Sequence, residues 1–399
     1  MTRYVIIGNS AAGAAAAREI RARDSAGEIV MISRDRAFYS RVQLPALLTG
    51  RKALAEISFV PPDWAAQFRV ATWLGVTVTG LDPARQTVQV APGEEIRYDR
   101  LLIASGAGTV FPRIPGLRGA GTFGFRNLED AEAVHARMGE TQRVAVIGAG
   151  LVGCELALVL AGLGKEVALL EIAPFPLPLQ LEEETGRLCA ELLNGHGIRL
   201  VCGDPAIKVE RDEGGQVCAL RLRSGVTVAA EAIVCAAGVR PHAEFAGGEA
   251  LQRRRGILID NGCQTSLENV FAGGDVAETA DAPAGEAQPA GLWSLAMKQG
   301  RTAGANLAGG RETLSGSAPL RVTINLAGTS MVAVGPAARD SSWKKQVVRS
   351  TDAKDQAAVK VFYMSGTALK AAVLWGDTAS AAVCSEAIAN GREFVYDNH

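Results

Sequence analysis

The sequence lacks the features that mark secreted, metal-binding and membrane-spanning proteins. Its seven cysteines form no Cys-x-x-Cys pair and their number is odd, so we expect no disulfide framework and a cytoplasmic, reducing location. The four histidines are scattered, and no zinc or iron–sulfur ligand spacing occurs, so no metal site is expected. No run approaches the roughly 18 apolar residues that a membrane span needs, and the first apolar run, Tyr4 to Ile7, is too short for a signal peptide.

The sequence also lacks an excess of either charge. It has 41 basic and 42 acidic residues and a net charge of -1, which argues against nucleic acid as the main partner. Its 399 residues, 48% of them hydrophobic, are enough for two or three globular domains.

What the sequence does contain is a strand, a glycine turn and a helix, twice over. The first copy predicts a strand at Tyr4–Ile7, a turn at Gly8-Asn-Ser-Ala-Ala-Gly13, a helix from Ala14 to Arg23 and a strand from Glu28 to Ser33. Such a unit implies a parallel sheet, and its turn places helix N–H groups where a pyrophosphate can bind. Ser10 replaces the middle glycine of the motif, and Arg34, with Asp35 beside it, stands where a ribose-binding acid is expected.

The second copy carries the full Gly-x-Gly-x-x-Gly motif. A strand at Val144–Ile147 leads into Gly148, Gly150 and Gly153, a helix follows from Cys154 to Leu163, and a strand from Glu166 to Leu170 ends beside Glu171. A carboxylate at that position binds both ribose hydroxyls and repels a 2′-phosphate. No Lys or Arg occurs between Glu171 and Arg187, so the pattern predicts NADH over NADPH. The alternative for Glu171 is a solvated acid at a strand end.

A third, smaller α+β domain is predicted after residue 320. Short strands are expected at Val322–Ile324 and Met331–Val334, a β-hairpin over Val359–Met364 and Thr367–Trp375, and a helix over Ala379–Ala389. Two segments, Ala280–Pro289 and Asp340–Gln356, are expected to be flexible loops.

Two dinucleotide sites in one chain suggest a protein that converts two-electron transfer into one-electron transfer. Nicotinamide delivers a hydride, and a flavin accepts it and can release electrons singly. The strand that ends in Asn269-Val-Phe-Ala-Gly-Gly-Asp275 fits a flavin site, because the glycines admit the cofactor chain and Asp275 can bond a ribitol hydroxyl.

With these motifs, the chain resembles flavoproteins that have two dinucleotide-binding domains. It is similar to the NADH:rubredoxin and ferredoxin reductase branch and to the FAD module of NADH-dependent nitrite reductases. The resemblance runs through nearly the whole chain, in these segments: 5–13, 39–45, 98–106, 144–157, 237–241, 269–277, 292–301 and 373–377.

The resemblance implies a domain plan and site residues. The FAD domain would comprise residues 1–112 and 245–320, with an NAD domain at 113–244 inserted and an interface domain at 321–399. FAD would be bound by Gly8, Ser10, Ala12, Gly13, Arg34, Arg41, Ser105, Gly106, Gly274, Asp275 and Trp293, with Arg41 at the pyrophosphate and Trp293 beginning a helix that faces the flavin. NAD would be bound by Gly148, Gly150, Leu151, Val152, Gly153, Glu171 and Gly238, with Glu155 near the nicotinamide. Trp293 as ordinary core and Glu155 as a solvated helix acid are the alternatives.

A missing thiol selects the branch of the family. Relatives with a single redox cysteine carry it three residues before the proline seen here as Pro45, where this chain has Val42, and no cysteine precedes Cys154. We therefore expect electrons to leave the flavin without a sulfur relay. Cys154, Cys189, Cys202, Cys218 and Cys235 are expected to be buried filler.

Three functions remain open on the sequence. The first is electron transfer from NADH through FAD to rubredoxin, ferredoxin or a similar iron protein, docked on a basic face for which Arg253–Arg255 and Lys344–Lys345 are candidates. The second is an NADH oxidase that uses oxygen, and the third is an FAD-binding redox sensor or a subunit of a larger complex. The sequence does not fix the oligomer, although the third domain of relatives often forms interfaces, as in a homodimer.

Overall fold

The computed structural model describes residues 1–247, 251–279, 291–314, 321–336, 340–351 and 357–396. Contacts divide the chain into two compact units. Unit 1 comprises Met1–Gly108, Arg126–Ala131 and Val239–Ser315, and unit 2 comprises Thr109–Phe125, Glu132–Gly238 and Gly316–His399. The three-domain division stays a prediction, since unit 2 holds both the second nucleotide-binding segment and the C-terminal segment. No helix in the described part of the chain is long and apolar enough to cross a bilayer.

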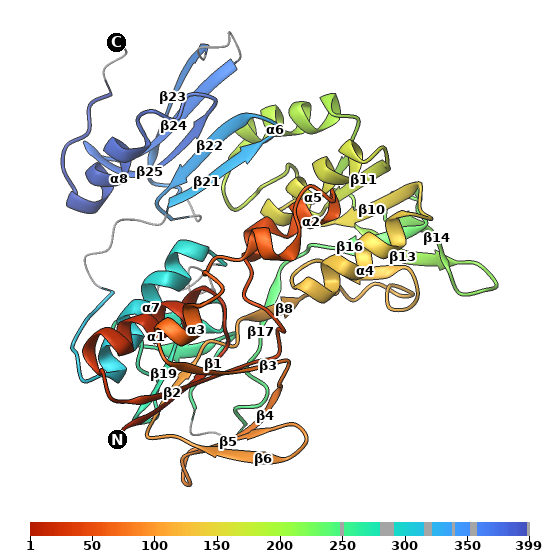
Figure 1. The fold of residues 1–399 in the computed structure, drawn as a ribbon. Helices are drawn as coiled ribbons and strands as arrows, with labels where there is room; N and C mark the ends of the chain where they lie inside the picture. The colour runs from red at the N-terminus through yellow and green to blue at the C-terminus, as the bar shows by residue number, and fades with distance from the viewer. Residues whose placement is uncertain (248–250, 280–290, 315–320, 337–339, 352–356, 397–399) are drawn as a thin grey trace. The chain divides into compact units, whose positions relative to one another are not determined.

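Unit 1 is built on a five-stranded parallel sheet with the order β19-β7-β1-β2-β3, of which β19, β1, β2 and β3 are labelled in Figure 1. Its central strands are apolar on both faces because helices and further strands cover them, as in α/β sheets generally. The strands are β1 (Arg3–Ile7), β2 (Glu28–Ser33), β3 (Val70–Leu74), β7 (Arg100–Ile103) and β19 (Val270–Ala272).

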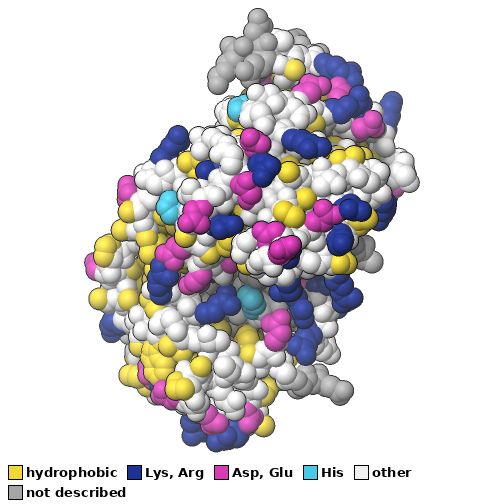
Figure 2. All heavy atoms as spheres, turned by 90° about the vertical axis from the view of Figure 1, so that its right-hand side faces the viewer, with side chains coloured by type: hydrophobic (Ala, Val, Ile, Leu, Met, Phe, Trp, Pro, Cys, Tyr) yellow, Lys and Arg dark blue, Asp and Glu magenta, His cyan; other side chains and the backbone are white. Residues whose placement is uncertain are grey.

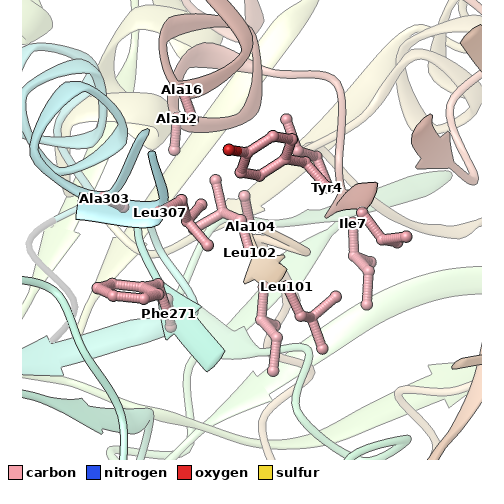
Figure 3. Packing of buried hydrophobic residues seen from close by; sticks show 14 of the residues in the cluster. Tyr4, Ile7, Ala12, Ala16, Leu101, Leu102, Ala104, Phe271, Ala303 and Leu307 are labelled. Atoms are coloured by element: carbon pink, nitrogen blue, oxygen red, sulfur yellow. The ribbon is translucent and has the colours of Figure 1, made fainter. Parts of the chain in front are cut away.

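Two helices from distant parts of the sequence pack side by side in unit 1. They are α1 (Ala11–Arg23) and α7 (Trp293–Leu307), drawn in red and cyan in Figure 1. Small residues allow the close approach, and Figure 3 shows Ala12 and Ala16 of α1 near Ala303 and Leu307 of α7 within the buried core. The Ala-rich sequence of α1, which favours a helix in any case, therefore also serves the packing.

The remaining elements of unit 1 are short. They are η1 (Arg41–Gln43), α2 (Leu44–Leu48), η2 (Leu54–Ile57), α3 (Trp64–Gln67), β8 (Ala107–Thr109), which runs into unit 2, β17 (Val239–Pro241), the parallel pair β18 (Ile257–Ile259) and β20 (Ala277–Thr279), and the antiparallel sheet β4 (Val78–Asp82), β5 (Thr87–Val90) and β6 (Glu94–Arg97).

Unit 2 repeats the parallel sheet. Its order is β12-β11-β10-β16-β9, so the predicted second dinucleotide-binding fold is confirmed. The elements are β9 (Thr122–Gly124), α4 (Leu128–Met138), whose first turn belongs to unit 1, β10 (Arg143–Ile147), α5 (Leu151–Gly162), β11 (Glu166–Glu171), α6 (Glu183–Gly195), β12 (Arg199–Cys202), β16 (Ala232–Cys235), and an antiparallel sheet of β13 (Ala206–Arg211), β14 (Val217–Leu222) and β15 (Thr227–Ala229).

Both helices that follow the glycine turns begin earlier than predicted. They start at Ala11 and Leu151 instead of Ala14 and Cys154, so Gly13 and Gly153 lie in the first helical turn. The sequence motif assigns Gly13 and Gly153 to the turns, whereas in the structure both lie inside a helix that packs closely against the first glycine of its turn.

The C-terminal segment forms a five-stranded antiparallel sheet with the order β21-β22-β25-β24-β23 and one helix on it. The elements are β21 (Arg321–Leu326), β22 (Thr329–Val334), β23 (Lys344–Thr351), β24 (Ala357–Ser365), β25 (Ala368–Trp375) and α8 (Ala381–Asn390).

The predicted α+β character of this segment is confirmed, but the flexible loop predicted over Asp340–Gln356 is wrong, because residues 344–351 pair with β24. A polar edge strand has no apolar face to mark it in the sequence. The other predicted loop, Ala280–Pro289, lies outside the described residues.

The close packing of α7 on α1 predicts the effect of a single methyl group. A Cβ on Gly300 would lie 2.2 Å from the Ala12 carbonyl oxygen, a backbone atom that cannot move aside alone. We expect Gly300→Ala to lower the free energy of unfolding by about 2 kcal/mol through overpacking. Urea unfolding measures this. The matched control is Gly162→Ala in α5, where no atom outside the local backbone lies within 4 Å, and an equal loss in both variants would contradict the packing argument.

Candidate functional site

The first glycine turn is forced by backbone packing at both ends. Gly8 has φ +110°, and a Cβ there would lie 2.1 Å from the Ala104 carbonyl oxygen, while a Cβ on Gly13 would lie 1.9 Å from the Gly8 carbonyl oxygen. Ser10 is the N-cap of α1 and its side chain makes no capping hydrogen bond. The first amides of α1, including that of Ala12, therefore open a helix N-terminus of the kind that binds phosphate.

At the end of β2, a serine stands where an acid that binds a ribose would be expected. Strand pairing aligns Ile32 with Ile7, as Leu170 aligns with Ile147, so Ser33 and not Arg34 is the counterpart of Glu171. The Ser33 hydroxyl donates to Asn9 Oδ1 at 2.9 Å, which closes the strand end with a neutral pair. Arg34 follows on the surface.

A buried charge network fixes the segment after β2. Arg41 forms an ion pair with Asp35 and donates to the Tyr39 hydroxyl at 3.1 Å and to the Arg126 carbonyl oxygen at 3.0 Å. Tyr39 in turn donates to Asp35 at 3.1 Å, and burial raises the pKa of its hydroxyl. Asp35 is only 5% exposed and its charge is compensated by Arg41, while Arg41 is held in place by its own neighbours.

Arg126 is a residue that the sequence reasoning missed. Its guanidinium forms an ion pair with Asp275, at the end of the Gly-Gly-Asp turn that follows β19. Burial, followed by the nearby Arg41 charge, lowers the pKa of Arg126 to about 10. No local pattern marks it, because its partner lies 149 positions away in the chain.

The Gly-Gly-Asp turn opens onto a small cavity of about 30 Å³ beside the start of α7. Gly274 has φ +78° and its N–H donates to Gln299 Oε1 at 2.8 Å, and Asp275, Leu292 and Ala296 also line the cavity. Trp293 begins α7 as predicted and packs edge-to-face on Phe59 with a centroid distance of 5.0 Å.

The crossover at Ser105 and Gly106 is tied to the returning chain. Ser105 donates to the His242 carbonyl oxygen at 2.6 Å, and the His242 N–H donates to the Gly106 carbonyl oxygen at 2.9 Å. Unit 1 therefore brings the predicted residues of the first turn, Arg41, the crossover and Asp275 into one compact body.

The second glycine turn repeats the same geometry with one difference. A Cβ on Gly148 or Gly153 would lie 2.6 Å or 1.8 Å from a carbonyl oxygen, whereas a Cβ on Gly150 would meet nothing within 4 Å. Protein packing thus explains the outer glycines only, and the middle glycine leaves the N-terminus of α5 open to a ligand. Leu151 begins α5 and Val152 is 37% exposed beside this opening, while Gly238 has φ +109° with free space around it.

Glu171 is aimed at this turn. Its carboxylate accepts from the Ala149 N–H at 2.8 Å and from the Ala173 N–H at 2.9 Å, and the residue is 9% exposed. Oriented in this way, it fits the acid that binds a ribose. Further along α5, Glu155 is half-buried and burial raises its pKa.

All seven cysteines are free. Cys154, Cys189 and Cys235 are buried as predicted, but the prediction is wrong for Cys202, which is half-buried, and for Cys218, which is exposed on β14. Val42, which stands where the family resemblance places the cysteine of single-cysteine members, is 60% exposed.

The basic residues suggested for docking are partly engaged within the chain. Lys345 pairs with Glu182, Arg254 lies 3.8 Å from Glu278, and Arg253 donates to the Ala243 carbonyl oxygen at 3.1 Å. On the face drawn in Figure 2, basic and acidic side chains are interspersed.

Two parallel-sheet nucleotide folds in one chain, each with a glycine turn, are typical of flavin- and nicotinamide-linked oxidoreductases. Comparison with known proteins agrees: the pyridine nucleotide-disulphide oxidoreductase family matches residues 2–300. The chain belongs to this family, and it is an NAD(H)-dependent flavin oxidoreductase that binds FAD and NAD(H).

Curated relatives include the epsilon subunit of NADH-dependent phenylglyoxylate dehydrogenase from Aromatoleum evansii, which is 30% identical over 84% of this chain and 79% of its own length. The assimilatory nitrate reductase electron transfer subunit of Bacillus subtilis is 29% identical over 94% of this chain, which spans 48% of that protein. Among solved structures, the NADH:rubredoxin oxidoreductase of Clostridium acetobutylicum has a TM-score of 0.81 at 25% identity and covers 100% of this chain and 97% of its own. A ferredoxin reductase from Rhodopseudomonas palustris has a TM-score of 0.89 at 23% identity, covers 99% of this chain and 96% of its own, and shows the shared fold.

The orientation of Glu171 predicts its contribution to nucleotide affinity. Glu171→Ala removes two carboxylate acceptors from the ribose side of the turn, and we expect NADH to bind about 10- to 100-fold more weakly, as for a lost charge-assisted hydrogen bond. Discrimination against NADPH should fall with it. Titration with both nucleotides measures the effect. Glu166→Ala, at the exposed start of the same strand, is the control, and unchanged NADH affinity in Glu171→Ala would rule out this role.

The raised pKa of Glu155 predicts a pH-dependent stability. The folded protein binds this proton more tightly than the unfolded chain, so the contribution to stability is complete below the unfolded pKa of about 4.3 and is lost as pH rises through the folded pKa. We therefore expect Glu155→Gln to match the parent near pH 4 and to be more stable at neutral pH. Urea unfolding at both pH values tests this, with the exposed Glu191→Gln as control; a parent more stable at neutral pH would contradict it.

Proposed function

We propose that this protein passes electrons from NADH through FAD to a separate one-electron acceptor, a rubredoxin, ferredoxin or related iron protein, without a redox-active thiol. The observation that carries the proposal is the combination of an open, acid-flanked second turn with an exposed valine at position 42. When bound, FAD accepts a hydride and can release electrons singly.

The residues of this chain would hold the two cofactors and leave the chemistry to them. The amides that follow Gly8 and Ser10 would bind the FAD pyrophosphate, with Arg41 supplying positive charge. Arg126 and Asp275, which pair with each other, would meet the flavin chain beside Trp293. Gly148, Gly150 and Glu171 would hold NADH, and Glu155 would approach the nicotinamide.

Several relatives support an electron-transfer partner. The Bacillus subtilis protein described above is named an electron transfer subunit. The ferredoxin–NAD(+) reductase component of the biphenyl dioxygenase system of Paraburkholderia xenovorans is 32% identical over 68% of this chain and 66% of its own length. Lys344 and Arg255 remain candidates for contact with an acidic acceptor. A homodimer through the C-terminal domain stays a proposal as well.

Two other functions have specific support. An NADH oxidase of Methanocaldococcus jannaschii is 30% identical over 77% of this chain, which favours oxygen as an alternative acceptor. The relative from Aromatoleum evansii is a subunit, which favours a place within a larger complex.

Anaerobic reduction separates these functions. NADH should bleach the flavin absorbance of the purified protein, and reduced rubredoxin or ferredoxin should then form at a rate that falls with ionic strength, because docking of an acidic acceptor is electrostatic. Turnover with oxygen as the only acceptor should be at least about tenfold slower. Equal or faster turnover with oxygen would make the protein an oxidase, and slow turnover with every acceptor would favour the subunit function.

The same preparation tests the absence of sulfur chemistry. Alkylation of the accessible thiols should leave NADH-dependent acceptor reduction unchanged, and the two-electron-reduced protein should show no thiolate-to-flavin charge-transfer absorbance. Loss of turnover on alkylation, with NADH protecting, would contradict the thiol-free route.

A further inference from the structure

The loop between β11 and α6, residues 172–181, is hydrogen-bonded to the second glycine turn. The Leu177 N–H donates to the Ala149 carbonyl oxygen at 2.8 Å, and the Leu177 side chain is fully buried. Ala149 is also the residue whose N–H holds the Glu171 carboxylate. The loop, the turn and the acid therefore form one connected piece, and a shift of the loop displaces the other two.

The other end of this loop is fixed by the first turn of α6. The Leu181 N–H donates to the Leu177 carbonyl oxygen at 2.8 Å, and Glu182 follows as the N-cap of α6, accepting from the Thr185 N–H at 2.9 Å. Phe175 of the loop lies against Gly186, where a Cβ would come within 2.6 Å of the ring. The position of the α6 N-terminus thus determines the path of the loop.

Strand β23 of the C-terminal sheet holds that N-terminus from outside. Lys345 forms an ion pair with Glu182, and Arg349 binds both oxygens of Glu184, at 2.6 Å and 2.7 Å. The two cations are four residues apart in an edge strand, so they point to the same face. A bidentate arginine pair fixes direction as well as distance.

We propose that Lys345 and Arg349 are positioning residues for NADH. Their ion pairs hold α6, α6 holds the loop, and the loop holds the glycine turn and Glu171 in the geometry that receives the nucleotide. The proposal rests on the proposed function of the second turn as the NADH site. It assigns the C-terminal domain a role in nucleotide affinity.

A charge-swap cycle on Arg349 and Glu184 tests the proposal without disturbing the helix cap at Glu182. Arg349→Glu and Glu184→Arg each replace an attraction with a repulsion, and the double variant restores the pair with its charges exchanged. Lys344→Glu is the matched control for Arg349→Glu, because it makes the same change of charge five residues earlier in β23. None of the measured quantities involves the electron acceptor that Lys344 is a candidate to bind. For each variant the dissociation constant for NADH, the rate of flavin reduction at saturating NADH, the FAD content and the urea midpoint are measured.

We expect Arg349→Glu and Glu184→Arg each to raise the dissociation constant for NADH about three- to tenfold, since partly exposed ion pairs contribute modestly. The reduction rate at saturating NADH and the FAD content should be unchanged. The dissociation constant of the double variant for NADH should return to within about twofold of the parent value. The dissociation constant of Lys344→Glu should also lie within about twofold of the parent value.

Each contrary outcome has a distinct meaning. Equal NADH affinity in the parent, Arg349→Glu and Glu184→Arg overturns the proposal while leaving the NADH site intact. An equal loss in Lys344→Glu overturns it in favour of a general charge effect, and a lower urea midpoint without a change in affinity reduces the pairs to a structural role. A parent protein that binds no NADH refutes the proposed function itself.

Discussion

The contact on which both halves of this protein depend is the close approach of a strand end, a helix start and a neighbouring strand at each glycine turn. At Gly8 and Gly148 a side chain would overlap the carbonyl oxygen of Ala104 or Ala236, and at Gly13 and Gly153 it would overlap the first glycine of the same turn. This packing places the start of α1 and of α5 directly at a strand end, and the first amides of a helix have no acceptor within the helix itself. The capacity to hold a pyrophosphate follows from this packing.

The two turns share this frame but differ in how the following strand ends. In unit 2 the end of β11 carries a carboxylate that is oriented by two backbone amides. In unit 1 the equivalent place holds Ser33, which is hydrogen-bonded to Asn9. The nearby Asp35 forms an ion pair with Arg41 and accepts a hydrogen bond from Tyr39. The same fold thus places a buried carboxylate at the strand end beside one glycine turn and a neutral hydrogen-bonded pair beside the other.

Charged side chains away from the turns set the surroundings of each site. In unit 1 the pairs Asp35–Arg41 and Arg126–Asp275 are largely shielded from water, where a charge without its partner is costly, so these residues hold one another in fixed positions. In unit 2 the pairs between β23 and α6 are more exposed and individually weak, and they act on a loop that itself borders the turn.

The amino-acid sequence was enough to predict the two parallel-sheet folds, the glycine turns, Glu171 at a strand end and the C-terminal hairpin, and the family resemblance added the start of α7 at Trp293. The features predicted from the residues follow from local periodicity or from glycine spacing, so their signal lies within a few positions of the chain. Four features could be seen only in the folded chain: Ser33 is the counterpart of Glu171, Arg126 pairs with Asp275, residues 344–351 form a strand, and Lys345 pairs with Glu182. The counterpart of Glu171 depends on strand register, and the two ion pairs join residues more than 100 positions apart. Strand β23 is an edge strand whose polar residues show no pattern. No local property of a chain encodes such pairings.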